Sequence, residues 1–303
     1  MPASRPRRSR GLLLAAVVLL LPVAAVADEL SFESIPWRGL TFEGSKFGIS
    51  LTAELGLESV PADLVVGRLS PSDQTPGVLP TGPSVVAIRL ASKVLGRKSE
   101  IELWVDPETA TAFQRVQTDS GKRQRVKTER YGERGITGVR LRPAKGEEGL
   151  PSASWSDLRR VFSEYPAWAG KNLRISDPTA LFYAVCAAKL ERPGDRVQIP
   201  LFSDGDFLIL EAKVVERRRV EVDYELVRRG SSRRRQGPVD ALRLALRAST
   251  LGPTAEQHDF ELAGLGGDVE LLFDAGNRLP LELSGKVPWA GRVAIDLRRV
   301  VEP

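Results

Sequence analysis

Apolar and polar residues alternate with a period of two over long stretches of this chain, and this alternation restricts the fold more than any other feature. Between Phe47 and Glu58, apolar side chains at the odd positions alternate with glycine and polar residues at the even ones. Successive side chains of a strand point to opposite faces of a sheet, so the pattern predicts a strand with one buried and one solvated face. Further strands are predicted over 86–91, 100–105, 110–142 in several pieces, 197–201, 206–215, 220–227, 239–247, 268–273, 279–284 and 291–297.

Two segments predict short helices instead. Ser156 can cap a helix over about 156–165, in which four apolar residues recur at helical spacing. Asp177 followed by Pro178 is a typical helix start, and it leads into an apolar run that predicts a helix over about 178–189.

A dozen or so strands with two short helices predict a mainly β fold. The fold class that fits is a large antiparallel sheet, either curled or closed into a barrel. Residues 28–303 are expected to form a single β-rich domain, and the segment 143–153, rich in proline, glycine and charge, is the best candidate for an internal boundary.

Residues 1–27 have the three-part pattern of a secretory signal peptide. Four arginines precede an uncharged run from Gly11 to Ala27, and the small residues Ala25 and Ala27 occupy the positions that signal peptidase reads. The run is short for a membrane span, which takes about 20 residues, although an uncleaved anchor is the alternative. We expect a Sec-type signal and a periplasmic or secreted protein, because the surroundings of Arg7-Arg8 fit a twin-arginine signal poorly. With no cysteine at the cleavage site, the protein is not expected to be a lipoprotein.

Composition after the signal argues against several classes of function. Removing four arginines from the 44 basic side chains leaves 40 against 39 acidic ones, so neither the charge nor the predicted export favours nucleic acid as a partner. One cysteine, Cys186, allows no internal disulfide, and its apolar neighbours predict a buried thiol. One histidine, His258, cannot build a His-rich zinc site, and no serine lies in a Gly-x-Ser-x-Gly turn. We expect no catalytic residue, no metal and no cofactor, and therefore no enzyme.

Eight arginines within 19 residues, at 217–219, 228–229 and 233–235, form the strongest local anomaly. On a hairpin turning near Gly230, the candidate ligand-binding residues at the tip are Arg228, Arg229, Arg233, Arg234 and Arg235. Guanidinium groups bind the phosphates of anionic lipid headgroups through paired hydrogen bonds. A solvated, disordered hairpin loop without a ligand is the alternative. A second and weaker basic stretch covers 122–127.

Several short patterns of the C-terminal half occur together. Asp177-Pro178 precedes the apolar helix, the strand Ile199–Phe202 leads to Asp204-Gly205, and the strand and acidic turn over 271–280 precede Gly285–Pro288. This half resembles the exported bacterial proteins classed as domain of unknown function 3108, best over 175–303 and more loosely over 40–142. Cys186 departs from that pattern, which has a basic residue there. The resemblance implies an envelope-associated β-rich protein and adds no catalytic residue.

These features lead to two hypotheses about function. The first is a non-enzymatic envelope protein that binds a lipid or other amphiphile in a groove of the curled sheet. The second is a structural or adaptor module that docks another envelope protein through an exposed strand edge. An interior cavity of several hundred Å3 would favour the first, and a filled interior with a long free edge would favour the second. A glycan hydrolase with paired carboxylates has no supporting spacing.

Overall fold

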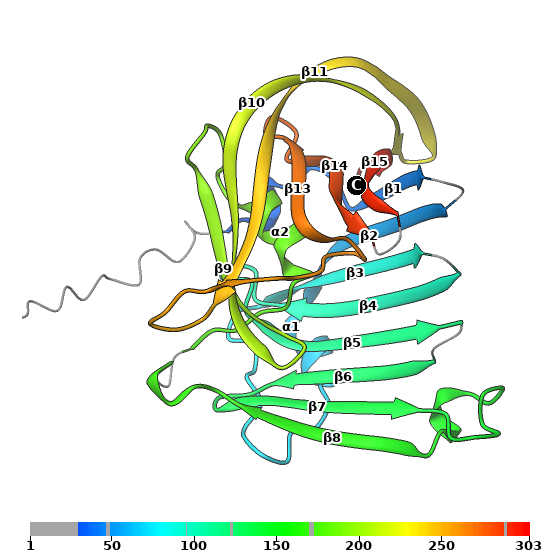
Figure 1. Ribbon diagram of the computed structural model, residues 1–303, viewed down its shortest axis with the longest axis vertical. Coiled ribbons are helices and arrows are strands. Elements are labelled where there is room, and N and C mark those ends of the chain that lie inside the picture. The colour runs from blue at the N-terminus through cyan, green and yellow to red at the C-terminus, as the bar shows by residue number, and fades with distance from the viewer. Residues whose placement is uncertain (1–29, 47–48, 95, 122–123, 170–172, 288–289) are drawn as a thin grey trace, which may run out of the picture.

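The structure is a computed structural model that describes residues 30–46, 49–94, 96–121, 124–169, 173–287 and 290–303. The predicted signal peptide, with Ala25 and Ala27, lies outside these residues. The strands of the described residues pair into one sheet of 15 strands (Figure 1). The mainly β fold with a large antiparallel sheet is therefore confirmed.

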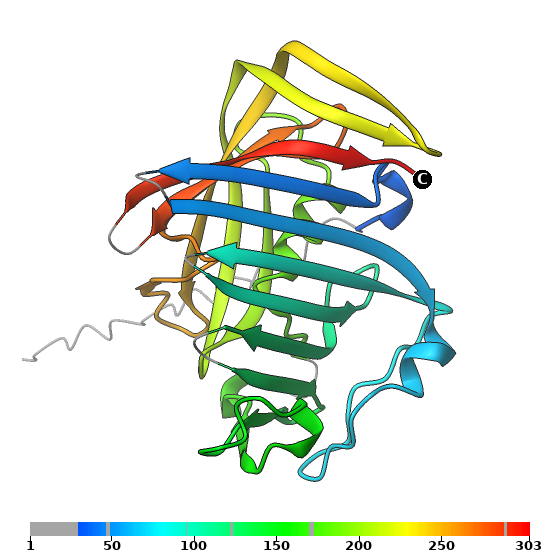
Figure 2. The ribbon, with the colours of Figure 1, turned by 90° about the vertical axis from the view of Figure 1, so that its right-hand side faces the viewer.

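The first half of the chain forms a run of sequential antiparallel neighbours, because each strand turns back on the one before it (Figure 2). A short helix, α1 (Ala62–Val66), packs with a small apolar cluster of Val85, Trp104 and Phe113. Three 3-10 turns, η1 (Phe32–Ser34), η2 (Ser152–Ser154) and η3 (Ala167–Ala169), lie in connecting segments. The strands are β1 (Gly39–Lys46), β2 (Ile49–Pro61), β3 (Ser84–Val94), β4 (Arg97–Val105), β5 (Ala112–Ser120), β6 (Arg125–Tyr131), β7 (Gly135–Arg142) and β8 (Asp157–Glu164).

The second half folds over the first and closes part of the sheet. Its strands are β9 (Arg196–Ser203), β10 (Asp206–Arg228), β11 (Ser231–Thr250), β12 (Gln257–His258), β13 (Gly266–Asp274), β14 (Leu279–Val287) and β15 (Gly291–Val301). β15 pairs with β1 and joins the two halves, while the far end of β10 pairs in parallel with β15. Strands β10, β11, β13, β14 and β15 thus form a closed circuit, which we call the ring. The sheet as a whole is curled, and its two ends are β8 and β9.

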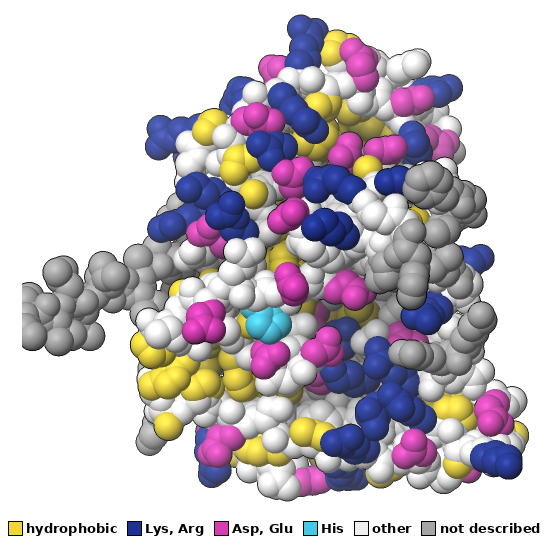
Figure 3. All heavy atoms as spheres, viewed as in Figure 1, with side chains coloured by type: hydrophobic (Ala, Val, Ile, Leu, Met, Phe, Trp, Pro, Cys, Tyr) yellow, Lys and Arg dark blue, Asp and Glu magenta, His cyan; other side chains and the backbone are white. Residues whose placement is uncertain are grey.

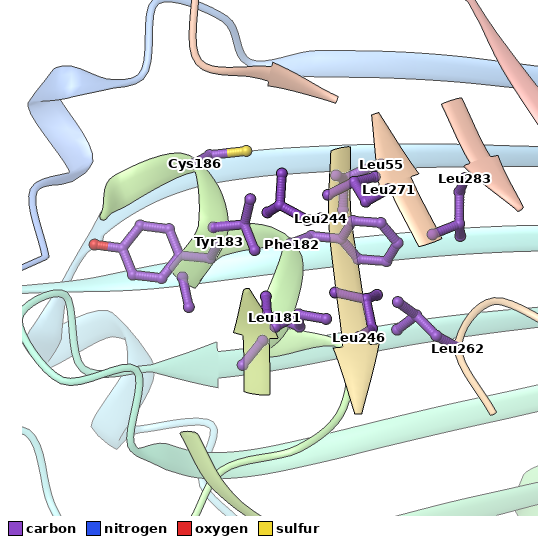
Figure 4. Close-up of a cluster of buried hydrophobic side chains, with 14 of the residues drawn as sticks. Leu55, Leu181, Phe182, Tyr183, Cys186, Leu244, Leu246, Leu262, Leu271 and Leu283 are labelled. Atoms are coloured by element: carbon purple, nitrogen blue, oxygen red, sulfur yellow. The ribbon is translucent and has the colours of Figure 1, made fainter. Parts of the chain in front are cut away.

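The core lies between the two halves and contains α2 (Ala180–Ala187), whose eight residues are all buried. This confirms the helix predicted over 178–189, slightly shortened at each end. In Figure 4, Phe182 lies beside Leu244 and Leu271, which come from β11 and β13. Burial raises the pKa of the Cys186 thiol well above its usual value, although Arg278 opposes this. The thiol predicted to be buried is therefore buried and protonated.

Arg278 closes the C-terminal end of α2. Its Nη1 donates to the carbonyl oxygens of Cys186 at 3.0 Å and Ala188 at 2.7 Å. The last carbonyls of a helix have no partner within the helix, and a cation there also opposes the negative end of the helix dipole. The carbonyl oxygen of Arg278 accepts a hydrogen bond from the Trp37 indole at 2.8 Å, which ties the first described segment to the same point.

The helix predicted over 156–165 is wrong, because this segment is the edge strand β8. Leu158 and Val161, which gave the helical spacing, have exposed fractions of 51% and 47%, so their spacing does not mark one buried face. The backbone of β8 pairs instead with β7, from Gly135 with Glu164 to Arg142 with Asp157. Pairing with β7 has overridden a local helical pattern, two of whose four apolar side chains are exposed. The segment 143–153 lies in the connection between these two neighbouring strands.

Candidate functional site

A cavity of about 1220 Å3 lies on the inner face of the curled sheet. Side chains from β3 to β6 form one wall, and the segments 177–179, 202–204 and 261–264 contribute to the rest. Figure 3, which shows the molecule from the side of Figure 1, has Lys and Arg side chains gathered over the region of β5 to β7. We call this cavity the sheet cavity.

The lining of the sheet cavity combines apolar and polar residues, and the apolar ones on the sheet come from β3 and β4. Apolar lining residues are Leu90, Val94 and Ile101 of β3 and β4, with Leu262 and Val287, and the same two strands also contribute the polar Ser92, Arg97, Lys98 and Ser99. At β5 and β6, alternate residues of each strand line the cavity, and all of these are polar: Arg115, Gln117, Asp119, Arg125, Lys127 and Glu129. Alternation explains this, because residues two apart on a strand share a face. The cavity therefore offers apolar and hydrogen-bonding surfaces side by side.

A buried network of ion pairs holds polar side chains of the sheet cavity in place. Arg115 Nη1 lies 3.1 Å from Glu129 Oε2, and Arg115 Nε lies 2.9 Å from Asp177 Oδ2. The exposed fractions of the three side chains are 12%, 5% and 4%, so water screens these charges little. Burial by itself lowers the pKa of Arg115, but the charges of Asp177 and Glu129 outweigh burial and raise the pKa. Lys127 Nζ also lies 3.0 Å from Glu129 Oε1.

A second group of hydrogen bonds continues the network toward the open ends of β4 to β6. Ser99 Oγ donates to Asp119 Oδ1 at 2.7 Å, and Gln117 Nε2 donates to the same oxygen at 2.8 Å. Arg125 forms an ion pair with Asp119 across the β5–β6 pair. Gln124 Oε1 is buried and accepts no hydrogen bond from any described residue. Most charges here are neutralised within the protein, which leaves a mixed surface of donors and acceptors.

The five arginines that the sequence predicts as ligand-binding residues do not lie at the sheet cavity. The hairpin is confirmed: β10 and β11 pair as far as Arg228 with Ser231, and Arg229 and Gly230 make the turn with positive φ. Arg233, Arg234 and Arg235 line a separate pocket of about 440 Å3, while Arg228 and Arg229 line neither cavity. None of the five lines the sheet cavity, so they cannot contact a ligand there directly.

Sequence reasoning missed the cluster of Arg115, Glu129 and Asp177. A signal for part of it was present, because 115, 117 and 119 alternate on one side of the turn at Gly121 and 125, 127 and 129 alternate on the other. A hairpin brings both sets to one face. No local sequence pattern predicts that Asp177, in the segment before α2, joins this cluster, because its position depends on long-range packing.

The remaining sequence candidates are placed as follows. His258 Nε2 lies 3.3 Å from Asp206 Oδ2 on a partly exposed surface. The described residues contain no group of three or more His, Cys, Asp or Glu side chains suited to a metal ion. In the same part of the chain, no helix has the length and apolar character that crossing a membrane takes.

No family model, curated protein or solved structure was found to match this chain. The resemblance to domain of unknown function 3108 stays a prediction.

Proposed function

We propose that this protein binds an amphiphile in the sheet cavity, as an exported, non-enzymatic component of the cell envelope. The observation that carries the proposal is the mixed lining, in which the apolar side chains of Leu90, Val94 and Ile101 lie beside the hydrogen-bonding groups of β4 to β6. Ligand pockets typically have volumes of roughly 300–1,000 Å3 and combine apolar walls with a few placed polar groups. The pattern of residues 1–27 supports the export part of the proposal.

The rigid polar network supports binding of a polar head without large rearrangement. Arg115, Glu129 and Asp177 hold one another, so the head meets groups that are already oriented. Preorganised groups lose less entropy when a ligand binds, which increases affinity. Because most of these charges are paired, a head that both donates and accepts hydrogen bonds fits this end better than a bare anion.

The test is native mass spectrometry of protein purified from its own envelope fraction, with extraction and identification of bound small molecules. Ile101→Lys places a charge on the apolar wall, and Glu100→Lys, its neighbour on the opposite face of β4, is the matched control. We expect a co-purifying amphiphile that is lost in Ile101→Lys and kept in Glu100→Lys. A clean ligand-free mass, unchanged after incubation with envelope lipids, would refute the proposal.

A second function is favoured by one observation, the open edge at β8. β8 is the terminal strand of the sheet, and Leu158 and Val161 are exposed on it. Such an edge can accept a strand from another protein through backbone hydrogen bonds. A photo-crosslinker at position 158 is expected to give one discrete adduct in envelope preparations if this adaptor function is correct. The same crosslinker at position 168, where exposed Trp168 lies outside β8, serves as control.

A further inference from the structure

The pocket of about 440 Å3 lies between the arginine hairpin and the segment that holds Trp37. It shares no lining residue with the sheet cavity. Its walls come from β10, β11, β14, β15 and the connection before β1, so it belongs to the ring end of the molecule (Figure 1). We call it the ring pocket.

The apolar wall of the ring pocket is firmly held. Trp37, Leu279 and Val300 are buried, and the Trp37 ring is fixed by the hydrogen bond from its Nε1 to the carbonyl oxygen of Arg278. Tyr224 and Leu226 of β10 complete this surface. Well-packed aromatic and aliphatic side chains of this kind form the preformed apolar part of a binding site.

Two solvent-exposed arginines face the same pocket. Register pairs Arg235 with Tyr224 and Arg233 with Leu226, and directly paired side chains lie on the same face of a hairpin. Neither Arg233 nor Arg235 forms an ion pair or a side-chain hydrogen bond with any described residue. Arg234 and Glu302 also line the pocket, and because Arg234 is paired with Asp223, two cations without an ion pair face one carboxylate there.

Arg234 also lines the ring pocket, but strand register puts its side chain on the opposite face of the hairpin, where it pairs with Asp223. Its Nε donates to Asp223 Oδ1 at 2.6 Å, and the pair is exposed. Of the three consecutive arginines, Arg234 has its charge neutralised by Asp223, whereas Arg233 and Arg235 have no ion-pair partner among the described residues. This difference follows from strand alternation and not from the number of arginines.

We propose that the ring pocket is a second binding site, which takes an anionic group on an apolar stem. Arg233 and Arg235 bind the anion, and Trp37, Leu279 and Val300 contact the stem. Guanidinium groups form short, charge-assisted hydrogen bonds with phosphate, sulfate and carboxylate oxygens, often two at a time. The site requires both parts of the ligand, and it is independent of whether the sheet cavity binds an amphiphile.

Isothermal titration calorimetry with octyl phosphate, below its micelle threshold, tests the proposal. The double variant Arg233→Ala/Arg235→Ala is expected to weaken binding at least tenfold. The control Arg228→Ala/Arg229→Ala removes the same charge from residues at the hairpin turn that line neither cavity, and it is expected to change the dissociation constant less than twofold. Far-UV circular dichroism confirms that both variants keep the strand content of the parent.

Three further titrations show which parts of the ligand are needed and which cavity holds it. Octyl glucoside, which lacks the charge, and inorganic phosphate, which lacks the stem, are each expected to bind at least tenfold more weakly than octyl phosphate. Equal binding of either one would overturn the proposal, as would equal loss in the two double variants. Loss of octyl phosphate binding in Ile101→Lys, with no loss in Arg233→Ala/Arg235→Ala, would place the ligand in the sheet cavity and also overturn it.

Discussion

Replacing Arg115 by methionine removes the cation that holds two buried carboxylates. Asp177 then has no described cation within ion-pair distance, while Glu129 keeps Lys127 Nζ at 3.0 Å. Removing one partner of a buried ion pair costs about 3–5 kcal/mol, because the remaining charge is left uncompensated. Because Lys127 still forms an ion pair with Glu129, we expect the loss in unfolding free energy to lie at the lower end of this range, about 3 kcal/mol. With a urea m-value of about 3 kcal/mol/M, the unfolding midpoint falls by about 1 M.

Arg89→Met is the matched control for this measurement. Arg89 also lies between two carboxylates, Glu58 at 2.9 Å and Glu102 at 3.3 Å, but its side chain is 56% exposed. Exposed pairs contribute about 0–1 kcal/mol, so the control is expected to shift the midpoint by less than about 0.3 M. Adding Asp177→Asn to Arg115→Met removes the stranded charge and is expected to recover part of the loss. Equal shifts for Arg115→Met and Arg89→Met would refute the reasoning.

Three further predictions concern the core and the ring. The Cys186 thiol is expected to react with a thiol reagent only after unfolding in urea, and rapid reaction in native buffer would contradict its burial. Arg278→Ala removes two hydrogen bonds from the end of α2 and is expected to lower the free energy of unfolding by about 2 kcal/mol in urea titration, with a loss below about 0.5 kcal/mol counting against it. Burial, and then the Asp296 charge directly opposite, raise the pKa of Glu282. A carboxyl with a raised folded-state pKa destabilises the fold above that pKa and not below its ordinary value of 4.5. Glu282→Gln should therefore be more stable than the parent at pH 7 by a few tenths to about 1 kcal/mol, and melting curves should show the difference vanish below about pH 4; a difference that persists in acid would contradict this.

Strand alternation made most of the sheet predictable, because the pattern says which residues share a face without reference to distant parts of the chain. The helix α2 was equally accessible, since Asp177-Pro178 marks its start and its surface is apolar almost all round. The helix predicted over 156–165 was wrong for the opposite reason. Two of its four apolar residues, Leu158 and Val161, are exposed on an edge strand, so the helical spacing does not mark a buried face.

The candidate sites were less predictable than the strands. Alternation places Gln117 and Asp119 on one face, but it does not say that this face is concave or that Asp177 packs against it. The arginine hairpin was visible in the sequence, whereas the difference between Arg234 and its two neighbours depends on the register of β10 with β11. Register and closure are set by contacts between residues far apart in sequence, which no local pattern reports.

The pairing of β15 with β1 has a consequence for how this chain folds. Gly39 is the partner of Val301, so the two halves of the sheet join through residues that lie far apart in the sequence. Contacts of such high sequence separation carry a large loop-closure entropy and slow the folding reaction. Until β15 arrives, the outer edge of β1 is open, and an open strand edge promotes aggregation. Folding in step with synthesis can thus assemble β1 to β8 early, but the sheet is complete only once β15 is available to pair with β1.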